Sequence, residues 1–154
     1  MQGQHSRERE QRLATRLSGR LLIVDDEPDV NIALAKVLER YGFIVDSYRN
    51  PLSALDNFKR HYYDLAILDI KMPGMNGFSL YREIKRLDKG LKICFLTAGE
   101  MYYGVYSDIL SSLPANHFIR KPIENQELLY RINEILGGTV DVAKGNSSWI
   151  ESII

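Results

Sequence analysis

Cysteine is almost missing from this sequence, and long hydrophobic runs are missing altogether. The 154 residues include one cysteine, Cys94, which excludes an intramolecular disulfide and a zinc site built on several cysteines. The longest apolar runs, such as residues 21–24, fall far short of the roughly 18 residues that a membrane span needs. The polar N-terminus also lacks the apolar stretch of a secretory signal peptide. These absences predict a soluble protein of the reducing cytoplasm, without a membrane partner.

An excess of charge of either sign is missing as well. The chain has 20 basic and 20 acidic residues, and its isoelectric point is about 6.8. Because a nucleic-acid-binding domain usually has a basic face and a high isoelectric point, we expect no direct contact with nucleic acid. Basic residues prevail only in residues 1–20, where five arginines oppose Glu8 and Glu10. That alternation of sign is typical of a solvated tail.

The sequence does contain a regular alternation of strand-like and helix-like segments. Short apolar runs rich in β-branched residues are typical of parallel strands buried on both faces. The expected strands are 21–24, 43–48, 65–68, 92–96 and a short strand around 118–119, and the expected helices include 30–41, 52–58, 78–87, 101–113 and 128–136. In the first helix, the spacing predicts Ala33 toward the core and Asn31 toward solvent. Cys94 is expected to be a small core residue of the fourth strand.

Five such strand–helix units predict an α/β fold. The fold class is a doubly wound, five-stranded parallel sheet with helices on both faces. Right-handed crossovers leave few strand orders, and the common one for five strands is the flavodoxin-like order 2-1-3-4-5. In this order, ligands bind at the carboxyl ends of the first and third strands, where the direction of the connections reverses.

The chain is accordingly divided into three parts. Residues 1–19 form a polar, Arg-rich arm, residues 20–137 form the α/β domain, and residues 138–154 form a C-terminal tail. The tail has an apolar end that begins at Trp149. We expect this end to dock on the domain or on a second subunit, because a tryptophan gains by leaving water.

Acidic residues occupy the predicted ligand-binding edge of the sheet. Asp25 and Asp26 follow the first strand, and Asp69 follows the third. Converging carboxylates repel one another, and a hard divalent cation such as Mg²⁺ relieves that repulsion. Thr97 after the fourth strand adds a hydroxyl, and Lys121 after the fifth adds an ammonium group. A carboxylate nucleophile, a cation and two further groups for phosphoryl oxygens indicate phosphoryl transfer.

Taken singly, each of these residues has a simpler explanation. Acids often begin a helix, a threonine often bonds within its own loop, and most lysines are solvated. Their joint occurrence at one edge of one sheet favours the functional interpretation.

Four stretches of the chain resemble the receiver domains of response regulators in two-component signalling. They are LLIVDDEPDV, DLAILDIKMPGMNG, FLTAG and NHFIRKPI, in this order and at suitable spacings. The resemblance spans about residues 20–137. It implies a phosphoacceptor signalling protein, and no enzyme beyond catalysis of its own phosphorylation and dephosphorylation.

The resemblance also implies roles for the acidic residues. Asp69 would accept a phosphoryl group from the phosphohistidine of a sensor histidine kinase or of a phosphotransfer protein. Asp25, Asp26 and Asp69 would hold Mg²⁺ together with the backbone carbonyl of Lys71. Lys121 would pair with a phosphoryl oxygen.

A conformational switch is implied in the same way. Thr97 would move onto the phosphoryl group, and Phe118 would swing inward as it does so. The output surface would consist of the helix over 101–113, the strand near 118–119 and the last helix. This surface would contact a downstream protein, and it is also the candidate surface for a homodimer.

Three other functions share part of this pattern. A phosphorylation-independent receiver-like interaction module is opposed by the presence of all five site residues. A haloacid-dehalogenase-like phosphatase would need Asp-x-Asp after its first strand, whereas Glu27 holds the second of these places here. A nucleotide or flavin binder is opposed by the lack of a Gly-rich phosphate loop after the first strand and of GxxxxGK[ST] anywhere.

Overall fold

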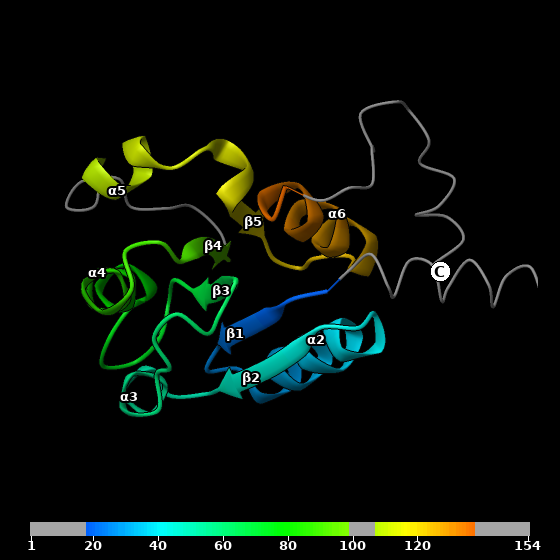
Figure 1. The fold of residues 1–154 in the computed structure, drawn as a ribbon, viewed down its shortest axis with the longest axis horizontal. Helices are drawn as coiled ribbons and strands as arrows, with labels where there is room; N and C mark the ends of the chain where they lie inside the picture. The colour runs from blue at the N-terminus through cyan, green and yellow to red at the C-terminus, as the bar shows by residue number, and fades with distance from the viewer. Residues whose placement is uncertain (1–17, 99–106, 138–154) are drawn as a thin grey trace, which may run out of the picture.

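The computed structural model describes residues 18–98 and 107–137, which form a five-stranded parallel sheet with surrounding helices (Figure 1). The strands are β1 (Arg20–Val24), β2 (Ile44–Tyr48), β3 (Leu65–Asp69), β4 (Lys92–Thr97) and β5 (Phe118–Arg120). The helices are α2 (Pro28–Arg40), α3 (Pro51–Asp56), α4 (Gly77–Leu87), α5 (Ser107–Ser112) and α6 (Asn125–Ile135), with a short 3₁₀ turn at Ala115–His117. The strand order is β2-β1-β3-β4-β5, which confirms the predicted doubly wound fold.

Helices cover both faces of the sheet. In Figure 1, α2 and α6 lie on one face and α3, α4 and α5 on the other. Strand β1 sends Leu21 and Ile23 into the core under α2 and α6, and Leu22 and Val24 into the core on the opposite face. All four side chains are fully buried, which explains why this strand is apolar at every position.

The register of β1 and β3 determines where their polar ends meet. Val24 pairs with Leu68 as the last partners of the two strands. The residues that follow, Asp25 and Asp69, therefore lie at the same carboxyl edge. This is the point at which the chain, after adding β2 on one side of β1, crosses to β3 on the other side.

Helix α2 departs from its predicted pattern. The spacing predicts Asn31 on the solvent side, but Asn31 is 4% exposed, and its side-chain amide donates to the backbone oxygens of Asp25 (3.1 Å) and Tyr48 (2.9 Å). Ala33, predicted to face the core, is exposed. The carbonyl groups at the ends of β1 and β2 need a hydrogen-bond donor, and Asn31 supplies it. The prediction was wrong because the spacing of hydrophobic residues gives no information about this need.

Several predictions concern residues outside the described ranges. The predicted helix over 101–113 is described only as α5, since residues 99–106 are not covered. Residues 1–17 of the N-terminal arm and the tail from residue 138 onward also lie outside the described residues. The three-part division of the chain therefore stays a prediction. Among the described residues, no helix is long and apolar enough to cross a membrane.

Cys94 is buried in β4, as predicted, which makes its thiol a probe of unfolding. Its side chain is fully buried, and burial raises the pKa of the thiol to about 12. Because the attacking species is an exposed thiolate, we expect the native protein not to react with a chromogenic disulfide reagent at pH 8. In denaturant, one thiol per chain should react. Rapid reaction without denaturant would contradict the buried position.

Candidate functional site

Two buried carboxylates face each other at the carboxyl edge of the sheet. Asp25 follows β1 and is fully buried, and Asp69 ends β3 with 2% exposure. Glu27, directly before α2, joins them, so that one carboxylate oxygen from each of the three residues lies within 4.8 Å of the others. The side chain of Asp26 also contacts Asp69 and contributes to raising its pKa. The predicted convergence of Asp25, Asp26 and Asp69 is therefore present in the structure.

Lys121 joins this cluster from the loop after β5. Its Nζ atom lies 2.8 Å from Asp25 Oδ2 and 3.3 Å from Asp69 Oδ1. The same atom lies 2.9 Å from Glu27 Oε1. The backbone N–H of Lys121 donates to the carbonyl of Thr97 at 2.7 Å, which holds this loop against the end of β4. The structure thus brings Lys121 to the acidic cluster, as predicted.

The proton affinities of the cluster reflect its burial. Burial and the charge of Asp25 raise the pKa of Asp69 to about 7, although the charge of Lys121 opposes this rise. For Lys121, burial alone would lower the pKa, but hydrogen bonds to Asp25 and Glu27 outweigh it and raise the pKa above its ordinary value. The cluster consequently has more negative charge than one lysine neutralises, and it favours a further cation.

Local backbone contacts hold Asp25 in place. Its Oδ1 atom accepts the backbone N–H of Glu27 at 2.9 Å, and its own N–H donates to the carbonyl of Tyr48 at 3.1 Å. Its carbonyl oxygen accepts from the buried Asn31. These contacts join the ends of β1 and β2 to the first turn of α2, so the Asp25 carboxylate has a defined direction.

Close backbone packing holds Asp69. Helix α4 begins at Gly77, whose N–H donates to the carbonyl of Ile70 at 2.8 Å. A Cβ atom on Gly77 would overlap the carbonyl oxygen of Asp69 and would lie 2.9 Å from Ile70 Cα. Only glycine therefore lets α4 begin this close to the end of β3. Gly77 is not among the site residues predicted from the sequence; its position at the end of the Pro-Gly-Met-Asn-Gly stretch was the available signal.

The predicted switch residues lie on neighbouring strands, beside the cluster. Thr97 ends β4 and pairs with Arg120 of β5. Phe118 begins β5 and stacks on Phe95 of β4, with ring centroids 5.5 Å apart and planes 18° apart. Lys71, two residues after Asp69, has an exposed side chain. The structure gives the positions of these residues, and their roles stay predictions.

Glu27 is the member of the cluster that the sequence analysis did not place in the site. The available signal was a third acid directly after Asp25 and Asp26. Its direction toward Lys121, 94 positions later in the chain, depends on the fold.

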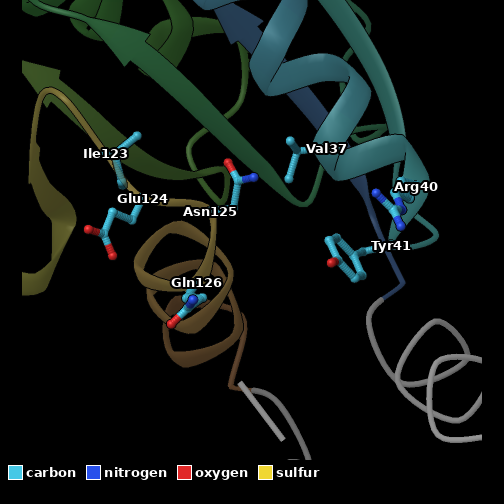
Figure 2. A pocket seen from close by; sticks show the side chains of 7 residues that line it. All are labelled: Val37, Arg40, Tyr41, Ile123, Glu124, Asn125 and Gln126. Atoms are coloured by element: carbon cyan, nitrogen blue, oxygen red, sulfur yellow. The ribbon is translucent and has the colours of Figure 1, made fainter. Parts of the chain in front are cut away.

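Two adjoining pockets open beside the cluster, between α2 and the start of α6. One, of about 510 Å³, has Glu27 and Lys121 in its wall together with apolar side chains of α2. The other, of about 540 Å³, lies between the end of α2 and the β5–α6 loop, and Figure 2 shows the side chains that line it: Val37, Arg40, Tyr41, Ile123, Glu124, Asn125 and Gln126. Ile123 and Asn125 line both pockets. The first pocket therefore borders Glu27 and Lys121, whereas Asp25 and Asp69 line neither pocket.

Sequence comparison finds clear relatives. Residues 21–133 match the model of the response regulator receiver domain. Chemotaxis protein CheY of Bacillus subtilis (strain 168) is 32% identical over 123 residues, which cover 78% of this chain and 99% of CheY. Transcriptional regulatory protein CusR of Escherichia coli (strain K12) is 36% identical over 118 residues, which cover 76% of this chain and 51% of CusR. The chain thus spans about half the length of the transcriptional regulators that it matches.

Solved structures agree in fold. A CheY-like receiver domain protein from Methanospirillum hungatei JF-1 superposes with a TM-score of 0.68 at 28% identity, covering 79% of this chain and 95% of that one. Response regulator TrrA from Thermotoga maritima, in complex with Mg²⁺ and BeF, gives a TM-score of 0.61 at 36% identity, covering 75% and 97%. Sequence and fold lead to the same family, and the chain belongs to the response regulator receiver domains of two-component signalling.

Proposed function

We propose that this chain accepts a phosphoryl group on Asp69 and passes the resulting signal to a protein partner. The donor would be the phosphohistidine of a sensor histidine kinase or of a phosphotransfer protein. The observation that carries the proposal is the position of the Asp69 carboxylate, which is buried at the sheet edge and shares the ammonium group of Lys121 with Asp25. A nucleophilic carboxylate with a fixed cation 3.3 Å away suits transfer of a negatively charged group.

The chemistry follows from these positions. An oxygen of Asp69 attacks phosphorus, and a P–O bond forms while the P–N bond to the donor imidazole breaks. The imidazole nitrogen keeps the electron pair of that bond. Lys121 lies close enough to Asp69 to donate to one of the transferred oxygens, which holds the phosphoryl group in line with the attack.

The donor set fits a magnesium site. Asp25 and Asp69 are buried, and a carboxylate oxygen of each lies within 4.8 Å of the other, so these two hard, negatively charged ligands need positive charge. We propose Asp25, Asp26, Asp69 and the carbonyl of Lys71 as the residues that hold Mg²⁺. When bound, the ion supplies positive charge for the phosphoryl oxygens.

We propose Thr97 and Phe118 as the residues that report phosphorylation. The Phe118 ring stacks on Phe95, and Phe95 in turn contacts Phe78 and Tyr81 of α4 at centroid distances of 4.9 Å and 5.6 Å. A movement of Phe118 would therefore change packing beneath α4 and α5. The surface formed by α5, β5 and α6 is the proposed output surface and the candidate surface for a homodimer.

Intact mass measurement tests the phosphoacceptor. After incubation with acetyl phosphate and Mg²⁺, we expect one phosphoryl adduct on the wild type, and none without Mg²⁺ or in Asp69→Asn. Asp56→Asn, which makes the same exchange at an exposed position on α3, should keep the adduct. If the folded wild type gains no adduct from acetyl phosphate or from a phosphorylated histidine kinase, the proposal is wrong and the phosphorylation-independent module is favoured.

A further inference from the structure

We propose that Glu27 is a displaceable partner of Lys121. In the unphosphorylated protein, the Glu27 carboxylate occupies the place on the ammonium group that a phosphoryl oxygen takes after transfer to Asp69. Glu27 is thus a positioning residue that holds Lys121 ready and competes with the incoming group. This inference rests on the proposed function of Asp69 and adds a residue to which that function assigns no role.

The surroundings of the Lys121 ammonium group set up this competition. Oxygens of Asp25, Glu27 and Asp69 lie 2.8, 2.9 and 3.3 Å from Nζ. Of these contacts, the one with Glu27 has the geometry of a hydrogen bond. The side chain of Lys121 is 10% exposed, so its ammonium group has little room to turn elsewhere. Three oxygens within 3.3 Å leave little space at Nζ, so a phosphoryl oxygen that approaches it competes with one of these carboxylates.

Burial indicates which carboxylate withdraws. The side chain of Asp25 is fully buried, and its second oxygen already accepts the Glu27 N–H. Asp69 carries the phosphoryl group and stays at the site. The side chain of Glu27 is 57% exposed and can rotate into water, where a carboxylate is well solvated. Glu27 therefore leaves Lys121 at the lowest cost.

The start of α2 supplies an independent observation. Glu27 is the N-cap residue of this helix, yet its side chain makes no capping hydrogen bond. The position usually favours Ser, Thr, Asp or Asn, whose short side chains turn back onto the first helical N–H groups. Instead, the carboxylate extends across the sheet edge to Lys121. The side chain of Glu27 therefore interacts with Lys121 and does not cap the helix.

Beryllofluoride, a phosphoryl mimic, tests the competition without turnover. Its affinity would be measured by calorimetry at saturating Mg²⁺ for the wild type, Glu27→Gln and Asp29→Asn. Asp29 is exposed and lines the same pocket as Glu27. Asp29→Asn removes one negative charge, as Glu27→Gln does, and is therefore the matched control. We expect Glu27→Gln to bind about three- to tenfold more tightly, the effect of removing one competing negative charge in a nearly aqueous medium. Asp29→Asn should change affinity by less than about twofold.

The variant Glu27→Asp separates the effect of the negative charge from the effect of side-chain length. It keeps the negative charge but is one methylene shorter, so it should release Lys121 in part and bind beryllofluoride more tightly than the wild type. Initial rates of phosphorylation by acetyl phosphate should rise in the same order as the affinities. Equal affinity in Glu27→Gln and the wild type, or an equal gain in Asp29→Asn, would overturn the proposal.

Magnesium affinity, measured without beryllofluoride, tests whether Glu27 is a metal ligand instead of a competitor for Lys121. If Glu27 were a metal ligand, Glu27→Gln would weaken Mg²⁺ binding by about a hundredfold or more, beyond the usual effect of losing an outer-shell partner, and the competition would be wrong. We expect a loss of about tenfold, because a charge that changes the binding of a monovalent anion about threefold acts twice as strongly, in free energy, on a divalent cation. If even the wild type binds no beryllofluoride and gains no phosphoryl adduct, the proposed function fails; if the wild type does both and the Glu27 variants match it, only this inference fails.

Discussion

Replacing Asp69 with asparagine should make the metal-free protein more stable at pH 8, by on the order of 2–4 kcal/mol. Burial and the neighbouring Asp25 raise the pKa of Asp69 to about 7. A carboxyl group whose pKa is higher in the folded state favours folding while it is protonated. That contribution is complete below the unfolded pKa of about 4 and is lost as the pH rises through 7. Asparagine has nearly the same shape and never acquires the unfavourable charge.

Urea unfolding in the presence of a chelator measures this difference. The free energy of unfolding of Asp69→Asn should exceed that of the wild type at pH 8, and the excess should shrink to near zero by pH 4. Asp56→Asn should follow the wild type at every pH, because Asp56 is exposed. Added Mg²⁺ should stabilise the wild type more than the variant, because Asp69 is a proposed ligand. A variant less stable than the wild type at pH 8 without metal would contradict the stated cause.

Gly77→Ala should destabilise the protein by about 2–4 kcal/mol and slow phosphorylation. The new Cβ atom would overlap the carbonyl oxygen of Asp69 and crowd Ile70 Cα, which lies 2.9 Å away. Both neighbours are backbone atoms, so relief requires that α4 or the end of β3 shift. Because alanine otherwise stabilises a helix by about 1 kcal/mol relative to glycine, a loss would be due to the close contact.

Gly90→Ala is the matched control. A Cβ atom at Gly90 would have one neighbour within 4 Å, the Asp88 Oδ1 atom at 3.8 Å, an ordinary contact distance. Its effect on the free energy of unfolding should be small. Chemical denaturation gives the free energy of unfolding of both variants, and the reaction with acetyl phosphate gives their rates of phosphorylation. Equal stabilities of Gly77→Ala and Gly90→Ala would show that the start of α4 can move freely.

The fold could be predicted from local properties of the chain. The run Leu65 to Leu68 is apolar at every position, and all four residues are fully buried in β3. Five such strands separated by helices leave few right-handed arrangements, and the order of the sheet is the expected one. Where both ends of an element are described, its boundaries agree to within a few residues, since proline restricts the backbone and glycine allows the left-handed conformation that ends many helices.

Part of the site could be predicted by the same reasoning. Residues after parallel strands meet at one edge, which is why Asp25, Asp69 and Lys121 were placed together before any distance was known. The prediction for Asn31 failed because its burial depends on two carbonyl groups, those of Asp25 and Tyr48, that only the finished sheet brings within reach.

The sequence by itself determined the alternation of elements, the strand order and the position of Asp25, Asp69 and Lys121 at the carboxyl edge, because these depend on residue type and spacing along the chain. The tertiary structure decided the rest: the contact of Glu27 with Lys121, and the absence of room for a side chain at Gly77. Such features depend on the direction of a side chain and on distances of a few tenths of an ångström between segments far apart in sequence. Only the packed sheet and helices determine these distances.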